Sequence, residues 1–349
     1  MRVIDCAGPG ISRRRAGKGF TYLDEGGDRV DDPEVIDRIR ALAIPPAWTD
    51  VWICPDPRGH IQATGCDDRG RRQYRYHDEW RARRDREKYD RMLDMARALP
   101  RLRERLARDL AETGLGRDRV LACAVRLLEL GLFRVGGEAY VEDNGSYGLA
   151  TVRKGHVRSV GGELRFDYPA KGGQRRVVEI RDPDVIDVVR ALKRRRRGGP
   201  ELLAYKDDRG CWVDVRSSDI NAYLQEALGP EFSAKDFRTW AATVLAAVAL
   251  AAEEGEADGE PSEAQRKRAV ARVVKDVAAQ LGNTPAVARG SYVDPRVIEE
   301  FQRGETVGDD VVEAVDDEDA LDRVDPEVLT EVEGAVVSLI ERGRRRRVR

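Results

Sequence analysis

The sequence predicts an α+β protein, with a small β-rich N-terminal domain in residues 1–90 and a larger, mostly α-helical domain in residues 91–303. Two observations support this fold class. Short apolar runs broken by Gly and Pro fill the first 90 residues, as is typical of strands joined by turns. Farther along, apolar residues recur at helical spacing in several segments between residues 118 and 281. A chain of 349 residues is long enough for two domains with separate cores.

The middle of the chain combines helices with strands. Residues 78–112 are charged and rich in helix-favouring residues, so we expect a helix that leads into the second domain. The apolar segment 118–133 predicts another helix, and short strands are expected around residues 147–152 and 156–162. Apolar residues alternate in the segment ELRFDY, so residues 163–180 predict a β-hairpin that turns at PAKGG. A second turn, KDDRG, precedes a short strand, CWVDV.

Three consecutive helices are expected at the end of the second domain. The second begins with a capping box at Ser262 and ends at Gly282, which places Asn283 just beyond a helix end. The third begins at the Thr-Pro pair after Asn283 and carries Tyr292. The first has one apolar stripe, formed by Phe237, Trp240, Ala241, Val244, Leu245 and Val248.

We expect residues 304–349 to form an extension that follows the second domain. Residues 304–325 are acidic and poor in apolar side chains, which indicates a linker. Residues 326–341 predict a helix with an apolar stripe, and the basic tail GRRRRVR follows it. An uncovered apolar stripe is unfavourable in water, so we expect this helix to pack on the rest of the chain or on a partner.

The net charge of −2 hides an uneven distribution. Residues 51–200 carry 34 Lys and Arg against 23 Asp and Glu, a net charge of +11. Residues 251–349 carry 15 against 24, a net charge of −9. A basic middle segment fits a polyanionic partner such as a nucleic acid, although an arginine-rich solvated surface would have the same composition.

Several function classes lack their signals in this sequence. The chain has no apolar run of about 18 residues, and its N-terminus lacks an apolar signal core, so we expect a cytoplasmic protein that does not enter a membrane. The five cysteines form no C-x-x-C pair, and Cys54, His60 and Cys66 are irregularly spaced for zinc. No Walker loop, G-x-S-x-G or H-E-x-x-H motif occurs. We therefore expect no metal and no cofactor.

A dispersed set of polar residues remains as the candidate site. FRVG contains Arg134, AKGG contains Lys171, KDFRTW contains Arg238, and LGNTPAVARGSY contains Asn283 and Tyr292. This set resembles the active-site segments of type IB DNA topoisomerases, in the poxvirus-like form also found in bacteria. That family has an arginine in R-x-G, a lysine in a hairpin turn, an arginine in K-D-x-R-T-[YW], and a tyrosine nine residues after [HN]-T-P. Each motif is weak alone, but their shared order and spacing make the resemblance specific.

The resemblance extends to candidate DNA contacts. The segment RRQYRYH at residues 71–77 is similar to an R-K-Q-Y-x-Y segment of the family, and a second match follows the first catalytic arginine. The lysine of KDFRTW is assigned a supporting contact. The residues that these matches place on DNA are Gln73, Tyr74, Tyr76, Tyr140, Asn144 and Lys235.

The resemblance implies a fold and a reaction. The second domain would have the catalytic fold shared by tyrosine recombinases and type IB topoisomerases, and the protein would clamp double-stranded DNA as a monomer. Tyr292 would attack the scissile phosphate and form a 3′-phosphotyrosine without ATP or metal. Arg134 and Arg238 would stabilise the phosphate, and Lys171 would protonate the leaving 5′-oxygen. Asn283 stands where the poxvirus enzymes have His, so it can donate a hydrogen bond but cannot transfer a proton.

Two other functions stay open at this stage. A tyrosine recombinase or integrase would share the fold and chemistry, although its usual box has His where this chain has Lys235. A non-catalytic DNA-binding protein is the second alternative. All candidate catalytic residues precede residue 311, so we expect the chemistry not to require residues 311–349.

Overall fold

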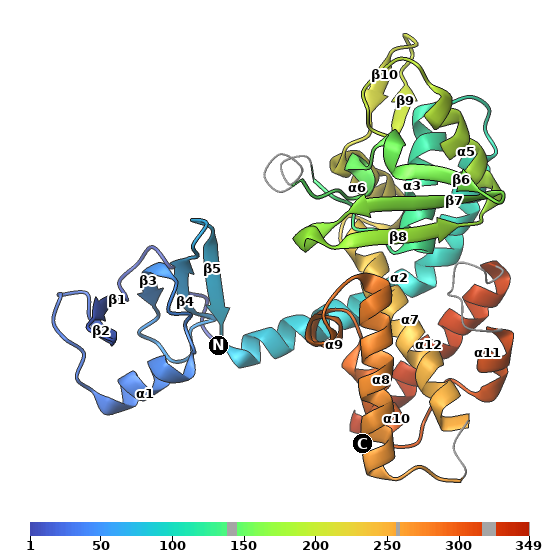
Figure 1. Ribbon diagram of the computed structural model, residues 1–349. Coiled ribbons are helices and arrows are strands. Elements are labelled where there is room, and N and C mark those ends of the chain that lie inside the picture. Colours follow the sequence, from blue (N-terminus) through green and yellow to red (C-terminus); the bar gives the residue numbers. More distant parts are fainter. Residues whose placement is uncertain (138–144, 256–258, 316–325, 349) are drawn as a thin grey trace. The chain divides into compact units, whose positions relative to one another are not determined.

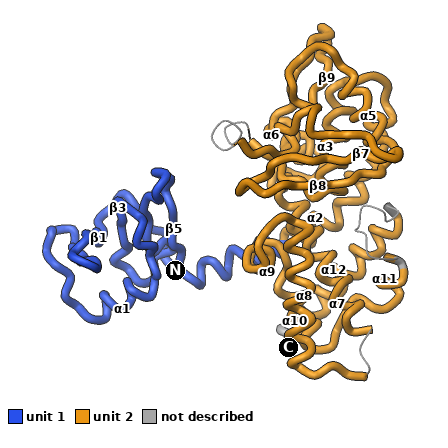
Figure 2. Tube along the Cα trace, viewed as in Figure 1, with its two compact units in different colours: residues 1–90 blue, residues 91–349 orange. Residues whose placement is uncertain are grey.

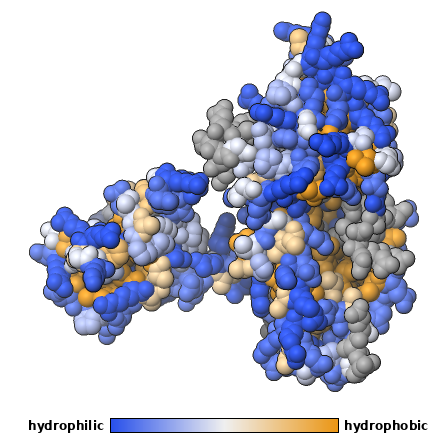
Figure 3. All heavy atoms as spheres, viewed as in Figure 1, coloured by the Kyte–Doolittle hydropathy of each residue, from blue (hydrophilic) through white to orange (hydrophobic). Residues whose placement is uncertain are grey.

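The computed structural model describes residues 1–137, 145–255, 259–315 and 326–348. The chain divides into two compact units, residues 1–90 and residues 91–349, coloured separately in Figure 2. The visible surface of each unit is largely hydrophilic (Figure 3), because most apolar side chains lie in the interior. Each unit has its own hydrophobic core.

Unit 1 is built on a five-stranded antiparallel sheet with the order β2-β1-β3-β4-β5 (Figure 1). One helix, α1 (Pro33–Ala41), starts at the Asp32 cap and packs its Ile39 into the core of the unit. This helix was not expected from the sequence, although the Asp-Pro pair at its start is a standard initiation signal. The strands are β1 (Ile11–Ala16), β2 (Gly19–Leu23), β3 (Thr49–Ile53), β4 (Ile61–Cys66) and β5 (Arg72–Tyr76).

The first half of unit 2 places a small sheet against helices. Helix α2 (Asp78–Leu110) begins in unit 1 and continues into unit 2, where α3 (Arg117–Gly131) follows. The expected hairpin is present and belongs to a three-stranded antiparallel sheet with the order β6-β7-β8. The elements of this half are β6 (Val157–Val160), β7 (Glu163–Pro169), β8 (Arg175–Ile180), α5 (Pro183–Arg194), β9 (Ala204–Lys206), β10 (Trp212–Asp214) and α6 (Ser217–Leu228).

The second half of unit 2 is helical (Figure 1). The chain therefore has a β-rich N-terminal region and a mostly helical remainder, which confirms the predicted α+β fold class. The stripe, the capping box and the Thr-Pro pair each mark a helix where they were expected. The helices are α7 (Ala234–Gly255), α8 (Glu263–Leu281), α9 (Pro285–Ser291), α10 (Pro295–Gln302), α11 (Asp309–Ala314) and α12 (Pro326–Val348).

Two local expectations were wrong. Residues 147–152 form no strand, because the backbone there makes a single 3₁₀ turn, η1 (Leu149–Thr151), with all three residues buried. Residues 304–325 are not all linker, since α11 lies among them and buries Val311 against the main core. Apolar residues of both segments pack into the main core, but the local sequence pattern does not show which elements they pack against.

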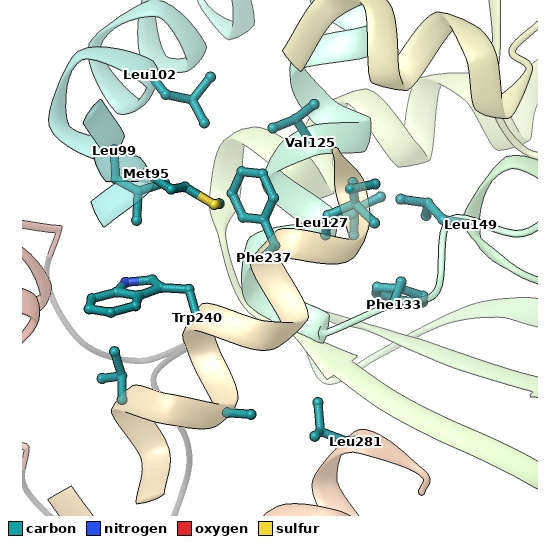
Figure 4. Packing of buried hydrophobic residues seen from close by; sticks show 14 of the residues in the cluster. Met95, Leu99, Leu102, Val125, Leu127, Phe133, Leu149, Phe237, Trp240 and Leu281 are labelled. Carbon is teal, nitrogen blue, oxygen red and sulfur yellow. The ribbon is translucent and has the colours of Figure 1, made fainter. Parts of the chain in front are cut away.

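Helix α7 is the centre of the main core. Phe237 and Trp240 are buried and point toward Met95 and Leu99 of α2 (Figure 4). The indole N–H of Trp240 donates to Glu333 of α12 at 2.9 Å. Both α7 and α10 pack against α12, so the final helix belongs to the body of unit 2.

Glu333 also takes part in a buried ion network. Arg103 of α2 donates to Glu333 at 2.8 and 3.0 Å and to Glu129 of α3 at 2.7 Å. All three side chains are at most 9% exposed. Removing one partner from such a group strands an uncompensated buried charge, which is strongly destabilising. Deletion of residues 311–349 would therefore remove part of the core and of this network. The expectation that the final helix packs on the rest of the chain is confirmed, and the expectation that the chemistry does not require these residues stays a prediction.

The packing of α12 predicts a large loss of stability on truncating its buried face. Ile340 is fully buried, so Ile340→Ala should lower the free energy of unfolding by about 2–5 kcal/mol, the usual range for such cavities. Ser338 lies on the exposed face of the same helix, and Ser338→Ala should change stability by no more than about 0.5 kcal/mol. Urea unfolding of both variants provides the measurement. Equal stability of the two would mean that α12 does not pack as described.

Candidate active site

A cationic pocket in unit 2 contains most of the predicted catalytic residues. Its volume is ≈ 480 Å³, and segments from five parts of the chain line it. Arg134, Lys171, Lys235, Arg238 and Tyr292 all border it. Among the lining residues that the structure describes there is no acidic side chain. Four cationic groups around one pocket are suited to an anion with several oxygens, such as a phosphate diester.

Arg134 follows the end of α3 in an extended segment. Its guanidinium donates to the carbonyl of Gly282 at 2.8 Å and to the side-chain oxygen of Asn283. Sterics explain the glycine of the R-x-G motif, because a Cβ atom on Gly136 would come within 2.8 Å of the backbone of Gly148. Gly136 also has a φ of +81°, which disfavours other residues. The motif thus lets two backbone segments meet beside Arg134.

Lys171 lies in the tight turn between β7 and β8. This turn, η3 (Lys171–Gly173), is closed by a hydrogen bond of 2.7 Å from the N–H of Ala170 to the carbonyl of Gln174. Gly172 and Gly173 have φ values of +81° and +73°, which explains the two glycines after the lysine. Lys171 is exposed at the tip of the hairpin and borders the pocket.

Arg238 sits in the first turns of α7 and is only 3% exposed. The Asp of its KDFRT motif has a capping role, since Asp236 accepts the N–H and the hydroxyl of Ser233, both at 2.8 Å. Arg238 donates to the carbonyls of Leu132 and Leu281, the latter at 2.7 Å. Burial, together with the nearby charge of Arg134, lowers the pKa of Arg238 to about 10. This guanidinium therefore stays protonated at neutral pH.

Tyr292 ends the short helix α9. Its ring lies beside Arg238, whose guanidinium carbon is 5.4 Å from the ring centre. Thr243 of α7 holds the backbone on both sides of the tyrosine, because its hydroxyl lies 3.3 Å from the carbonyl oxygen of Tyr292 and accepts the N–H of Asp294 at 3.1 Å. Thr243 was not among the residues expected from the sequence. Most residues of α7 around Thr243 are buried, so the local sequence gives no signal of this role.

Asn283 lies just beyond α8, as its sequence context predicts. Gly282 caps this helix in the left-handed conformation, and the side-chain oxygen of Asn283 accepts from Arg134. The side-chain nitrogen Nδ2 is buried and has no hydrogen-bond partner in the part of the chain that the structure describes. Asn283 is not among the residues that line the pocket, but it is hydrogen-bonded to Arg134, which does line it. A buried N–H₂ group of this kind is a candidate donor for a ligand oxygen.

A third arginine, Arg176 of β8, was not a candidate from sequence. It donates to the carbonyls of Gln280 at 2.6 Å and Gly131 at 3.0 Å. Burial, helped by the charge of Arg134, lowers its pKa. Strand alternation could have revealed it, because position 176 shares the inward face of β8 with Val178 and Ile180. Tyr147, which lines the pocket and packs against His156, had no recognisable sequence signal.

The candidate DNA contacts at 71–77 lie in unit 1, on the edge strand β5. Tyr74 and Tyr76 are 44% and 40% exposed on one face, with their ring centres 6.0 Å apart. Gln73 faces the other way and donates to Asp67 at 3.0 Å. Exposed paired aromatics on an edge strand form a surface on which a flat partner could lie. Two further candidates, Tyr140 and Asn144, lie outside the described residues.

Among the described residues, no group of three or more His, Cys, Asp or Glu side chains is arranged to hold a metal ion. Within the same residues, no helix combines the length and apolar character that crossing a membrane requires.

Comparisons with known proteins agree with the geometry of the site. A family model described as the catalytic core of eukaryotic DNA topoisomerase I matches residues 77–309, and one described as the N-terminal domain of bacterial DNA topoisomerase IB matches residues 19–67. The chain is 34% identical over 297 residues to a DNA topoisomerase 1B of Acanthamoeba polyphaga mimivirus, covering 84% of this chain and 88% of that relative. The first model spans more than half of the chain, and the relative covers most of it. The chain therefore belongs to the type IB DNA topoisomerase family and is an isomerase that acts on DNA.

Proposed function

We propose that this topoisomerase relaxes supercoiled DNA by cutting and rejoining one strand through a 3′-phosphotyrosyl intermediate, without ATP or metal. The observation that carries the proposal is the single pocket shared by Tyr292, Arg134, Arg238 and Lys171. A nucleophile, two permanent cations and a proton donor are the groups that phosphodiester transfer needs.

In the forward step, the phenol of Tyr292 loses its proton to water as its oxygen attacks phosphorus, and the bond from phosphorus to the 5′-oxygen breaks. Arg134 and Arg238 stabilise the charge on the nonbridging oxygens, and Asn283 donates its buried N–H₂ to the same group. Lys171 gives a proton to the leaving 5′-oxygen. Rejoining reverses these steps and needs no external energy, because the phosphotyrosyl bond conserves that of the broken backbone bond. While the strand is open, rotation of the DNA releases supercoils.

The direct test uses supercoiled plasmid with EDTA and no ATP. Relaxation under these conditions supports the proposal. Strand exchange at particular sites would instead indicate a tyrosine recombinase, and binding without cleavage would indicate a non-catalytic DNA-binding protein. Lys235, where the recombinases usually carry His, lies in the pocket and favours the topoisomerase reaction.

The proposal also covers the DNA contacts, the oligomeric state and the location of the protein. We assign Gln73, Tyr74 and Tyr76 of β5, together with Lys235, to contacts with double-stranded DNA, and keep Tyr140 and Asn144 as candidates from sequence. We keep the monomer that the resemblance implies as the expected active form. The cytoplasmic location expected from the N-terminus stays a prediction.

Removing the phenol oxygen should abolish the chemistry but not binding. Tyr292→Phe should form no SDS-stable DNA adduct and relax no plasmid, while its affinity for duplex DNA in a gel-shift assay stays near that of the unchanged protein. Tyr205→Phe, on β9 outside the pocket, is the matched control and should stay active. An adduct in the Tyr292→Phe protein would mean that another residue attacks.

The role of Lys171 can be tested through the leaving group. Lys171→Ala should cleave normal DNA slowly, because general acid catalysis typically contributes about 10²–10⁴-fold. A bridging 5′-sulfur at the scissile phosphate leaves without needing a proton, so single-turnover cleavage of that substrate should be largely restored. Equal defects on both substrates would remove Lys171 from the role of acid.

Asn283 should act as a donor and not as an acid or base. Asn283→Ala should slow cleavage by about 10²–10³-fold or somewhat less, the cost of losing one oxyanion donor. Asn283→His should keep much of the activity, since an imidazole N–H can reach a similar position. Single-turnover rates of the two variants test this, and an unchanged rate in the Ala protein would leave Asn283 with only a structural role.

A further inference from the structure

Arg176 is the first side chain after the hairpin tip that is anchored in the body of unit 2. Residues 171–175 are all exposed, and residue 176 pairs with the buried Tyr168 across the hairpin. The inward direction of Arg176 follows from its position on β8, where it shares a face with Val178 and Ile180. On the β8 side, the location of the tip thus depends on where this side chain is held, while on the β7 side the buried Ala170 directly precedes Lys171.

The guanidinium of Arg176 bridges two helix ends. It donates to the carbonyl of Gln280 in the last turn of α8 at 2.6 Å and to that of Gly131 at the end of α3 at 3.0 Å. The last carbonyls of a helix have no partner within the helix and carry partial negative charge, so they bind a cation well. Arg176 consequently ties the hairpin to the ends of two helices that are far from it in sequence.

The two arginines of the pocket do not need this bridge for their own placement. Arg238 is held by Leu132 and Leu281, and Arg134 is held by Gly282 and Asn283. Arg176 itself is not among the residues that line the pocket. Loss of its side chain would therefore loosen the β8 side of the hairpin tip and leave the direct hydrogen bonds of the other two guanidinium groups in place.

We infer that Arg176 is a positioning residue for Lys171: by holding β8 against the C-terminal ends of α3 and α8, it places the tip of the hairpin beside the pocket. The inference rests on the proposed function, in which Lys171 protonates the 5′-oxygen. An acid must stay within hydrogen-bond reach of its target, and a displacement of about 1 Å can cost roughly 100-fold in rate. Arg176 does not touch the DNA in this scheme.

The experiment measures single-turnover cleavage of a normal DNA substrate and of one with a bridging 5′-sulfur. Arg176→Ala should slow cleavage of the normal substrate by about 10- to 100-fold, and cleavage of the sulfur substrate should be close to that of the unchanged protein. Arg176→Lys keeps the charge but cannot bridge both carbonyls in the same way, so it should show the same pattern with a smaller loss. If the Ala variant does not fold, the Lys variant still allows the rates on the two substrates to be compared.

Arg175 provides the matched control on the same strand. It is exposed and pairs only with Asp167 among the contacts described here, so Arg175→Ala should cleave both substrates normally. The inference is overturned if Arg176→Ala and Arg176→Lys cleave normal DNA at the unchanged rate, if their defects are equal on the two substrates, or if Arg175→Ala behaves like them. Failure of the proposed function looks different, because the unchanged protein would then cleave neither substrate.

Discussion

The site depends on the carbonyl groups at the C-terminal ends of α3 and α8. Gly131 and Leu132 at one end, and residues 280–282 at the other, point acceptors into a region from which much of the water is excluded. A buried carbonyl without a partner is costly, and Arg134, Arg176 and Arg238 together remove that cost. The same contacts draw three distant segments together and concentrate positive charge at one place.

This arrangement also explains why the core around α7 matters for the site. Arg238 can reach Leu132 and Leu281 only if α7 lies correctly between α3 and α8, and its position is set by Phe237 and Trp240 packing against neighbouring helices. Trp240 in turn contacts Glu333 of α12. The final helix lies outside the motifs of the resemblance, yet it supports the helix that carries one of them.

Local sequence patterns predicted much of the fold, and the resemblance to a family identified most of the residues that meet in the pocket. The hairpin, the helix boundaries at Ser262 and Gly282, and the fold class follow from periodicity and caps that neighbouring residues determine. The strand expected at 147–152 was wrong, because burial of those residues comes from a 3₁₀ turn whose hydrogen bonds reach back to residues 134 and 135. Arg176 and Thr243 were missed for a related reason. Their partners lie 104 and 49 residues away, a separation at which a single sequence without relatives carries no pairing signal.

The anchoring of the guanidinium groups has an entropic consequence. A free arginine side chain loses about 2 kcal/mol of rotamer freedom when it is ordered. Arg134 and Arg238 are already held by backbone carbonyls in the protein alone, so this loss occurs during folding and not when a phosphate arrives. In the proposed function, association with the backbone of DNA then proceeds without first ordering these two groups.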